Sequence, residues 1–113
     1  MALATAYIKN SLATKYSTEA LYAALYTTAP GATAGTEVTG GSPAYARASL
    51  TWSAASGGQI TASATFNVPA CTVVGSGFHS ASTGGTYVDG FAIASTTFTG
   101  QDTLTVNYTF SVS

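Results

Sequence analysis

The sequence predicts a mainly β protein: an antiparallel β-sandwich, of jelly-roll or immunoglobulin-like type, with one short helix at its N-terminus. Three observations predict this class. Most of the chain after Leu21 alternates between apolar and small polar side chains, which is the period of a half-buried strand. Turn residues separate these stretches at fairly regular intervals. Only the first sixteen residues have apolar side chains spaced by three to five, as on one face of a helix.

Residues 1–16 form the predicted helix. A helix of this length is only marginally stable in water by itself, so it must pack against its own domain or against a neighbour. We therefore divide the chain into an N-terminal helical docking segment, residues 1–16, and a β-sandwich domain, residues 17–113. The apolar face of the helix, which we expect to form an interface, consists of Leu3, Tyr7, Ile8 and Leu12.

The first predicted strand covers residues 21–26. Its apolar and aromatic side chains fall on both faces, so the strand could be buried on both, and Ala29-Pro30-Gly31 ends it with turn residues. The segment that follows, residues 31–43, is rich in glycine and threonine and is too long for a hairpin turn. Loops of this length usually have a function or make contacts.

Two further strands are predicted to form an antiparallel hairpin. Residues 46–53 and 60–66 alternate small or apolar side chains with polar ones, and Ser56-Gly57-Gly58 lies between them. This pattern is typical of two paired strands with one dry face and one exposed face.

The remaining chain continues the β pattern. After an irregular stretch interrupted at Pro69, residues 78–81 and 86–94 flank a predicted tight turn that contains two glycines. A last turn at residues 99–102 leads into residues 103–112, which show the cleanest alternation in the chain. Large aromatic residues bury about 150–250 Å² each, and those expected to point inward are Trp52, Phe66, Phe91, Tyr108 and Phe110.

The composition excludes several kinds of partner. Charged residues make up 6% of the chain, against about 25% in an ordinary soluble domain. Three basic residues and a net charge of −1 cannot neutralise a row of phosphates, so nucleic acid is not an expected partner. The apolar runs are far shorter than the ~20 residues of a membrane-spanning helix, and residues 1–12 lack the features of a signal peptide. Cys71 is the only cysteine, which excludes an internal disulfide and fits a reducing compartment.

The few residues that could perform chemistry do not form a convincing site. A zinc site needs three or four ligands, and the chain has one cysteine, Cys71, and one histidine, His79. A serine triad with His79 and Asp89 would rest on the abundance of serine alone. Asp89 and Asp102 each lie in a turn-like context, where aspartate usually bonds the local backbone. We expect no catalytic, metal or cofactor site.

Five other residues are candidates for an interface. Arg47 and Glu37 stand out in a chain with few charges; they could pair within the domain, which is the simpler alternative, or Arg47 could reach a neighbour from its place beside Tyr45. Seven tyrosines are too many for a small core. Tyr22 and Tyr26, placed on the exposed face, would suit either a protein interface or the stacking of a sugar ring.

Several of these segments carry a resemblance. Residues 25–31 form a strand that ends in Ala-Pro-Gly, residues 35–41 combine Glu-Val with Gly-Gly, and residues 45–47 read Tyr-Ala-Arg. With the turns at residues 81–85 and 100–104, this pattern resembles small virion structural proteins of tailed bacteriophages, described as tail fibre, minor tail or minor capsid proteins. The similarity covers most of the chain and implies a β-sandwich virion component without enzymatic activity.

Composition and resemblance together favour a capsid decoration or minor capsid protein, made in the host bacterial cytoplasm and bound to the outside of the shell. Its expected partners are the major capsid protein and further copies of itself, with a trimer as one candidate. The second hypothesis places the same fold in the tail, as a minor tail or fibre-associated protein. The third, from another class, is a carbohydrate-binding module for cell-wall glycans, which needs exposed aromatic platforms.

Overall fold

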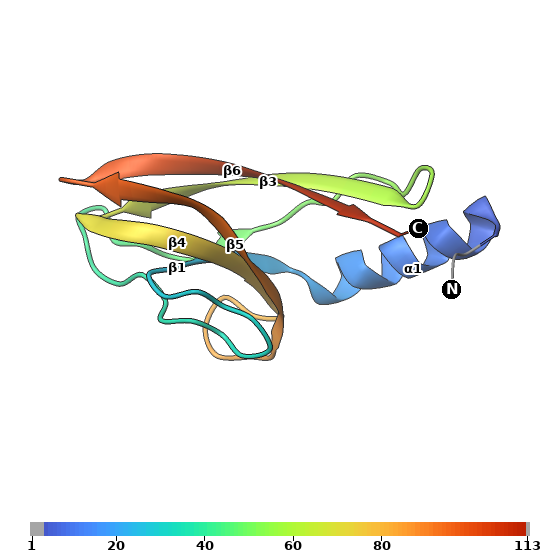
Figure 1. Ribbon diagram of the computed structural model, residues 1–113, viewed down its shortest axis with the longest axis horizontal. Helices are drawn as coiled ribbons and strands as arrows, with labels where there is room; N and C mark the ends of the chain where they lie inside the picture. The colour runs from blue at the N-terminus through green and yellow to red at the C-terminus, as the bar shows by residue number, and fades with distance from the viewer. Residues whose placement is uncertain (1–3, 113) are drawn as a thin grey trace.

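The structure, a computed structural model, describes residues 4–112 and confirms a mainly β fold with antiparallel sheets and one helix (Figure 1). Two sheets form the layers of a sandwich, with strand orders β2-β1-β4-β5 and β3-β6. The elements are α1 (Ala6–Glu19), β1 (Tyr22–Tyr26), β2 (Ala48–Ser49), β3 (Gln59–Val68), β4 (Cys71–His79), β5 (Tyr87–Phe98) and β6 (Asp102–Ser111).

The core lies between the two sheets. Phe66 on β3 and Tyr108 on β6 face Leu25, Val73 and Phe78 of the larger sheet, and all five are buried. Of the other aromatic residues expected to point inward, three pack partly buried against this core or its end: Trp52, Phe91 and Phe110.

Helix α1 extends the sandwich along its long axis, which measures 47 Å (Figure 1). The helix begins after Thr5, whose hydroxyl accepts a hydrogen bond from the Ile8 amide at 3.3 Å, as an N-cap residue does. The helix covers Ala6–Glu19 and so begins and ends later than the predicted helix of residues 1–16; the division of the chain into a docking segment and a sandwich domain stays a prediction. Leu3 lies outside the described residues. No helix within residues 4–112 is long and apolar enough to cross a membrane.

The strand predicted to bury both faces does so. Residues 23–26 of β1 are fully buried, because β1 lies inside its sheet between β2 and β4 and the ring of Tyr87 on β5 packs against that of Tyr26. On β4, a Cβ atom added at Gly77 would lie 2.8 Å from the Tyr26 ring. Glycine is required there because the tyrosine packs directly on the β4 backbone.

The predicted hairpin of residues 46–53 with residues 60–66 is wrong in its pairing. Within residues 46–53 only β2 is a strand, and it pairs with β1. β3 pairs along its full length with β6 instead, with Phe66 opposite Leu104. Alternation specifies which face of a strand is buried but not which strand it pairs with. Pairing with β6 joins ten residues of β3, more than residues 46–53 could offer.

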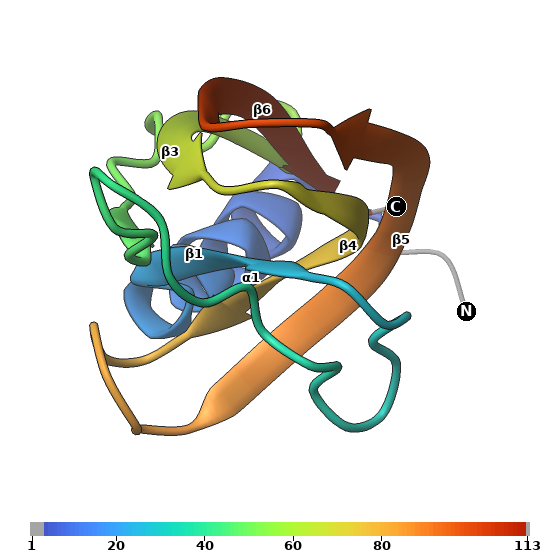
Figure 2. The ribbon, with the colours of Figure 1, turned by 90° about the vertical axis from the view of Figure 1, so that its left-hand side faces the viewer.

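The later turns confirm the prediction. Gly84 and Gly85 have φ values of 62° and 70° in the turn between β4 and β5, a region that favours glycine. The turn at residues 99–101 joins β5 to β6. These two strands belong to different sheets, and the chain crosses from one sheet to the other on one side of the sandwich (Figure 2). Asp89 is corrected from a turn to a strand position, within β5.

Candidate interaction surface

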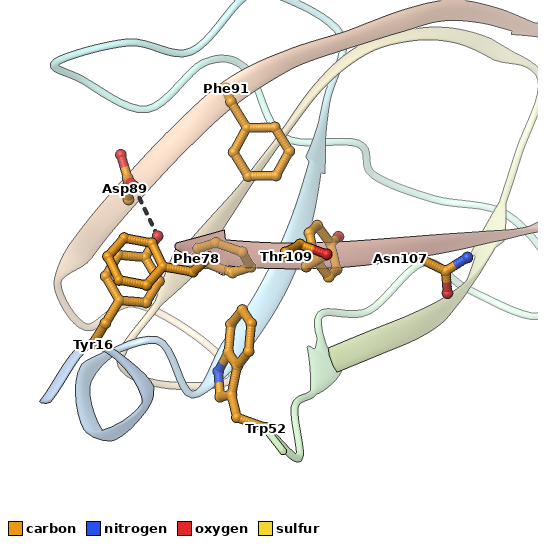
Figure 3. Close-up of a pocket in the computed structure, with 9 residues that line it drawn as sticks. Tyr16, Trp52, Phe78, Asp89, Phe91, Asn107 and Thr109 are labelled. Carbon is orange, nitrogen blue, oxygen red and sulfur yellow. Dashed lines mark hydrogen bonds between the residues drawn. The ribbon is translucent and has the colours of Figure 1, made fainter. Parts of the chain in front are cut away.

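An aromatic cluster fixes the C-terminal half of α1 to the end of the sandwich. The Tyr16 ring stacks on Phe110, with ring centroids 3.8 Å apart, and makes edge contacts with Trp52 and Phe78 at 6.1 and 6.0 Å. Its hydroxyl donates a 2.8 Å hydrogen bond to Asp89 (Figure 3). Because Ala13, one helical turn earlier, is fully buried, this part of the helix belongs to the packed fold.

A cleft of about 290 Å³ opens beside this cluster, lined by aromatic rings from α1, β4, β5 and β6 together with Asp89, Asn107 and Thr109 (Figure 3). Burial, reinforced by the hydrogen bond to Asp89, raises the pKa of Tyr16 well above its ordinary value. The phenol therefore stays protonated and donates. Asp89 is already used by Tyr16 and by the Gly90 amide, so the cleft offers apolar contact rather than a free acid and base.

The indole of Trp52 is also used inside the fold, because its Nε1 donates to the Ala20 carbonyl at 2.8 Å. Trp52 is partly buried and Tyr26 is fully buried. The exposed aromatic platforms that the carbohydrate-binding hypothesis needs are therefore not formed by these two rings.

Arg47 and Glu37 confirm the simpler alternative and pair within the protomer. Arg47 Nε and Nη2 donate to the two oxygens of Glu37, each at 3.0 Å. Arg47 Nη1 donates to the carbonyls of Ala81 and Gly84 at 3.0 and 2.9 Å. One guanidinium thus connects the loop containing Glu37 to the turn between β4 and β5, and we call this arrangement the Arg47 latch.

Tyr45 completes the latch. Its hydroxyl donates to Glu37 at 2.7 Å and accepts from the Leu25 amide at 3.0 Å, which attaches the latch to β1. Burial by itself would raise the pKa of Glu37, but the hydrogen bonds from Arg47 and Tyr45 hold it below its ordinary value. The carboxylate is therefore charged and fully engaged.

Tyr26 and Tyr22, the two tyrosines predicted on the exposed face, have different positions. Tyr26 is fully buried, and its hydroxyl is hydrogen-bonded to His79 Nε2, so its predicted exposure is wrong. Tyr22, at the start of β1, is partly exposed. His79 is the last residue of β4 and Cys71 is the first, which places them about 26 Å apart and rules out a shared site. No cluster of three or more metal-binding side chains occurs in the described part of the chain.

The exposed apolar residues gather on α1. Tyr7 is 80% exposed, Ile8 38% and Leu12 44%, and Leu21, just after the helix, is 41% exposed. The helix that carries them is anchored at Asn10, whose Oδ1 accepts a 2.8 Å hydrogen bond from the Gly58 amide. The structure thus leaves the predicted docking residues exposed on a helix held in place, but Tyr7 and Leu12 lie about 140° apart around its axis, so they do not share one narrow face. The docking role itself stays a prediction.

These features are those of a small structural module in which Arg47, Glu37 and Asp89 are bound within the fold and most of the exposed large apolar side chains lie on α1. A family model described as Podophage GP4 fiber I protein gp80 matches residues 2–111, and the chain belongs to this family. No curated protein and no solved structure matches the chain. The match confirms the predicted resemblance and identifies a phage virion structural protein, of a family described as a fibre protein.

Proposed function

We propose that this protein is a non-enzymatic, fibre-associated component of the phage tail. The observation that carries the proposal is the match of nearly the whole chain to a family described as a fibre protein. The sequence favoured a capsid decoration protein and placed the tail second; the description of the family supports the second alternative.

The proposed attachment site consists of the exposed side chains of Tyr7, Ile8 and Leu12 on α1. Solvent-exposed apolar side chains grouped on one rigid element are typical of interaction surfaces. The helix is presented without loss of order, because Tyr16 and Asn10 hold it to the sandwich. A partner with an apolar groove, in the tail or at its junction with a fibre, would accept this helix face.

The docking test uses substitutions that preserve the helix. Tyr7→Ala and Leu12→Ala together remove most of the exposed apolar surface, and alanine favours the helical state. We expect the double variant to unfold like the wild type but to be absent from particles. The matched control, Ser11→Ala with Thr14→Ala on the same helix, should be incorporated fully. Normal incorporation of the Tyr7→Ala, Leu12→Ala variant would refute the attachment site. Deletion of residues 1–16 is a poorer test, because it removes Ala13 and Tyr16 from the packed fold.

The location is tested separately by counting copies and by electron microscopy. Quantitative mass spectrometry of purified particles should give about three to twelve copies for a tail component and tens to hundreds for a capsid decoration protein, as the symmetries of the two structures require. Antibody or gold labelling should mark the tail. A count in the hundreds, with the label on the shell, would contradict the tail location and favour a capsid decoration protein.

A further inference from the structure

β6 has one free edge, and the structure shows which backbone groups lie along it. The Val112 amide donates to the Gly58 carbonyl at 2.8 Å, and β3 and β6 continue in one register, with Gln59 opposite Ser111. Hydrogen-bonded pairs alternate with non-bonded pairs in an antiparallel ladder. The even-numbered residues of β6 therefore bond β3, and the odd-numbered residues direct their amides and carbonyls away from it.

This edge lacks the features that usually prevent strands from associating. Residues 102–111 contain no proline and no lysine, and Asp102 at the start is the one charged residue. The Thr103 amide is covered by the Asp102 carboxylate at 2.8 Å, which leaves the rest of the edge open. Protein edge strands are normally protected by charges, proline, bulges or short length. Of the other edge strands, β5 is irregular, because its pairing with β4 shifts register twice, and β3 accepts a hydrogen bond from the Ser53 amide on its outer edge.

The apolar side of β6 is also incompletely covered. Leu104, Val106 and Phe110 point toward the core but remain partly exposed, since a two-stranded sheet faces a four-stranded one. Ten residues of β6 extend about 34 Å at ~3.4 Å per residue. The unpaired backbone groups and the partly exposed apolar side chains follow this length, so a second strand of the same kind fits along it.

We propose that a second copy of this chain pairs with β6 edge to edge, with the two β6 strands antiparallel about a two-fold axis at Asn107. Asn107 is the odd-numbered residue nearest the middle of the strand, so this register gives the longest overlap. Thr105 then lies opposite Thr109 of the second copy, and the two Asp102 carboxylates lie at opposite ends. The two-stranded sheet becomes a four-stranded sheet, and one self-complementary edge closes the pair.

Cysteine cross-linking tests the register directly. In a Cys71→Ala background, Asn107→Cys places two thiols on facing residues with Cα atoms about 5.5 Å apart, which a disulfide can span. The matched control is Ser63→Cys, because Ser63 lies opposite Asn107 on β3 and is also exposed. In the proposed dimer, Ser63 of one copy and Ser63 of the second copy are separated by three strand-to-strand distances, or about 14 Å. Mild oxidation should give a covalent dimer from Asn107→Cys and none from Ser63→Cys. No dimer, or equal amounts from both variants, would overturn the proposal.

A second variant tests the edge without new chemistry. Asn107→Pro removes an outward amide and leaves the ladder to β3 intact, as proline in an edge strand can. In sedimentation or light-scattering measurements we expect a wild-type dimer whose dissociation constant rises about tenfold or more in Asn107→Pro, with the circular dichroism spectrum retained. A wild-type monomer at all concentrations, or a trimer insensitive to Asn107→Pro, would overturn the proposal. Because purified protein is used, this result is independent of the position of the protein in the particle.

Discussion

Truncation of Arg47 to alanine tests how the long loop between β1 and β2 is held. The guanidinium makes four hydrogen bonds, two to Glu37 and two to the carbonyls of Ala81 and Gly84. Removing it leaves a partly buried carboxylate with Tyr45 as its remaining side-chain partner, and it leaves two carbonyls without this donor. Both effects destabilise the folded state.

The burial of the pair sets the magnitude. The side chains of Arg47 and Glu37 are 11% and 26% exposed. Removing one partner of a fully buried ion pair costs about 3–5 kcal/mol, and the residual exposure of Glu37 favours the lower end. We expect a loss of about 3 kcal/mol in the free energy of unfolding, or roughly 12 °C in melting temperature for a chain of this size. Lys15 is the matched control: its pair with Glu19 is 71% and 52% exposed, so Lys15→Ala should cost less than about 0.5 kcal/mol.

Urea unfolding at pH 7, followed by circular dichroism, measures both variants. A double-mutant cycle of Arg47→Ala with Glu37→Gln then isolates the pair from the carbonyl contacts, and the coupling energy should be about 1 kcal/mol or more. If Arg47→Ala costs no more than Lys15→Ala, or if the cycle shows no coupling, the latch does not hold the loop and the reasoning from burial is wrong.

Two further predictions concern acid and the aromatic cluster. Burial lowers the pKa of His79 below its ordinary value of 6.5, and the latch lowers that of Glu37 below 4.5. A group with a lowered pKa in the folded state stabilises the fold at pH values above its ordinary pKa, and this stability is lost as the pH falls through the lowered pKa. The free energy of unfolding in urea should therefore fall in two steps, first with His79 and then, at lower pH, with Glu37. The second step should be absent in Glu37→Gln. Tyr16→Phe removes the bond to Asp89 and should cost about 1 kcal/mol, whereas Tyr16→Ala also removes the stack on Phe110 and should cost about 3–5 kcal/mol in the same assay.

The elements that could be predicted were those whose signal is local. The final strand and the Gly84-Gly85 turn match the sequence closely, because a period of two and a positive φ are properties of neighbouring residues. The partner of a strand is not such a property. Residues 46–53 have a convincing alternation, yet most of this segment is irregular, because β3 gains ten paired residues from β6 at the other end of the chain.

The positions of single side chains followed the same division. Arg47 and Glu37 could be recognised as a pair because charges are rare in this chain. Tyr26 could not be recognised as buried, because the residues that pack on it, Gly77, His79 and Tyr87, lie on β4 and β5, far away in the sequence. The role of Tyr16 was missed for a related reason: its spacing of four from Leu12 was visible, but Asp89 and Phe110, which hold it, lie on β5 and β6.

The scarcity of charge has a consequence for assembly when the two proposed surfaces are considered together. Of the seven charged residues, Arg47 and Glu37 are bound to each other, Lys15 is paired with Glu19, and Asp89 holds Tyr16. Little charge is left to keep copies apart. A β6-paired dimer would carry two docking helices, and Leu12 of each lines a cleft with Phe110 and Val112 near the C-terminal end of β6. Binding of the first helix raises the effective concentration of the second to about millimolar when the geometry fits, so weak docking by one helix face would suffice for stable attachment.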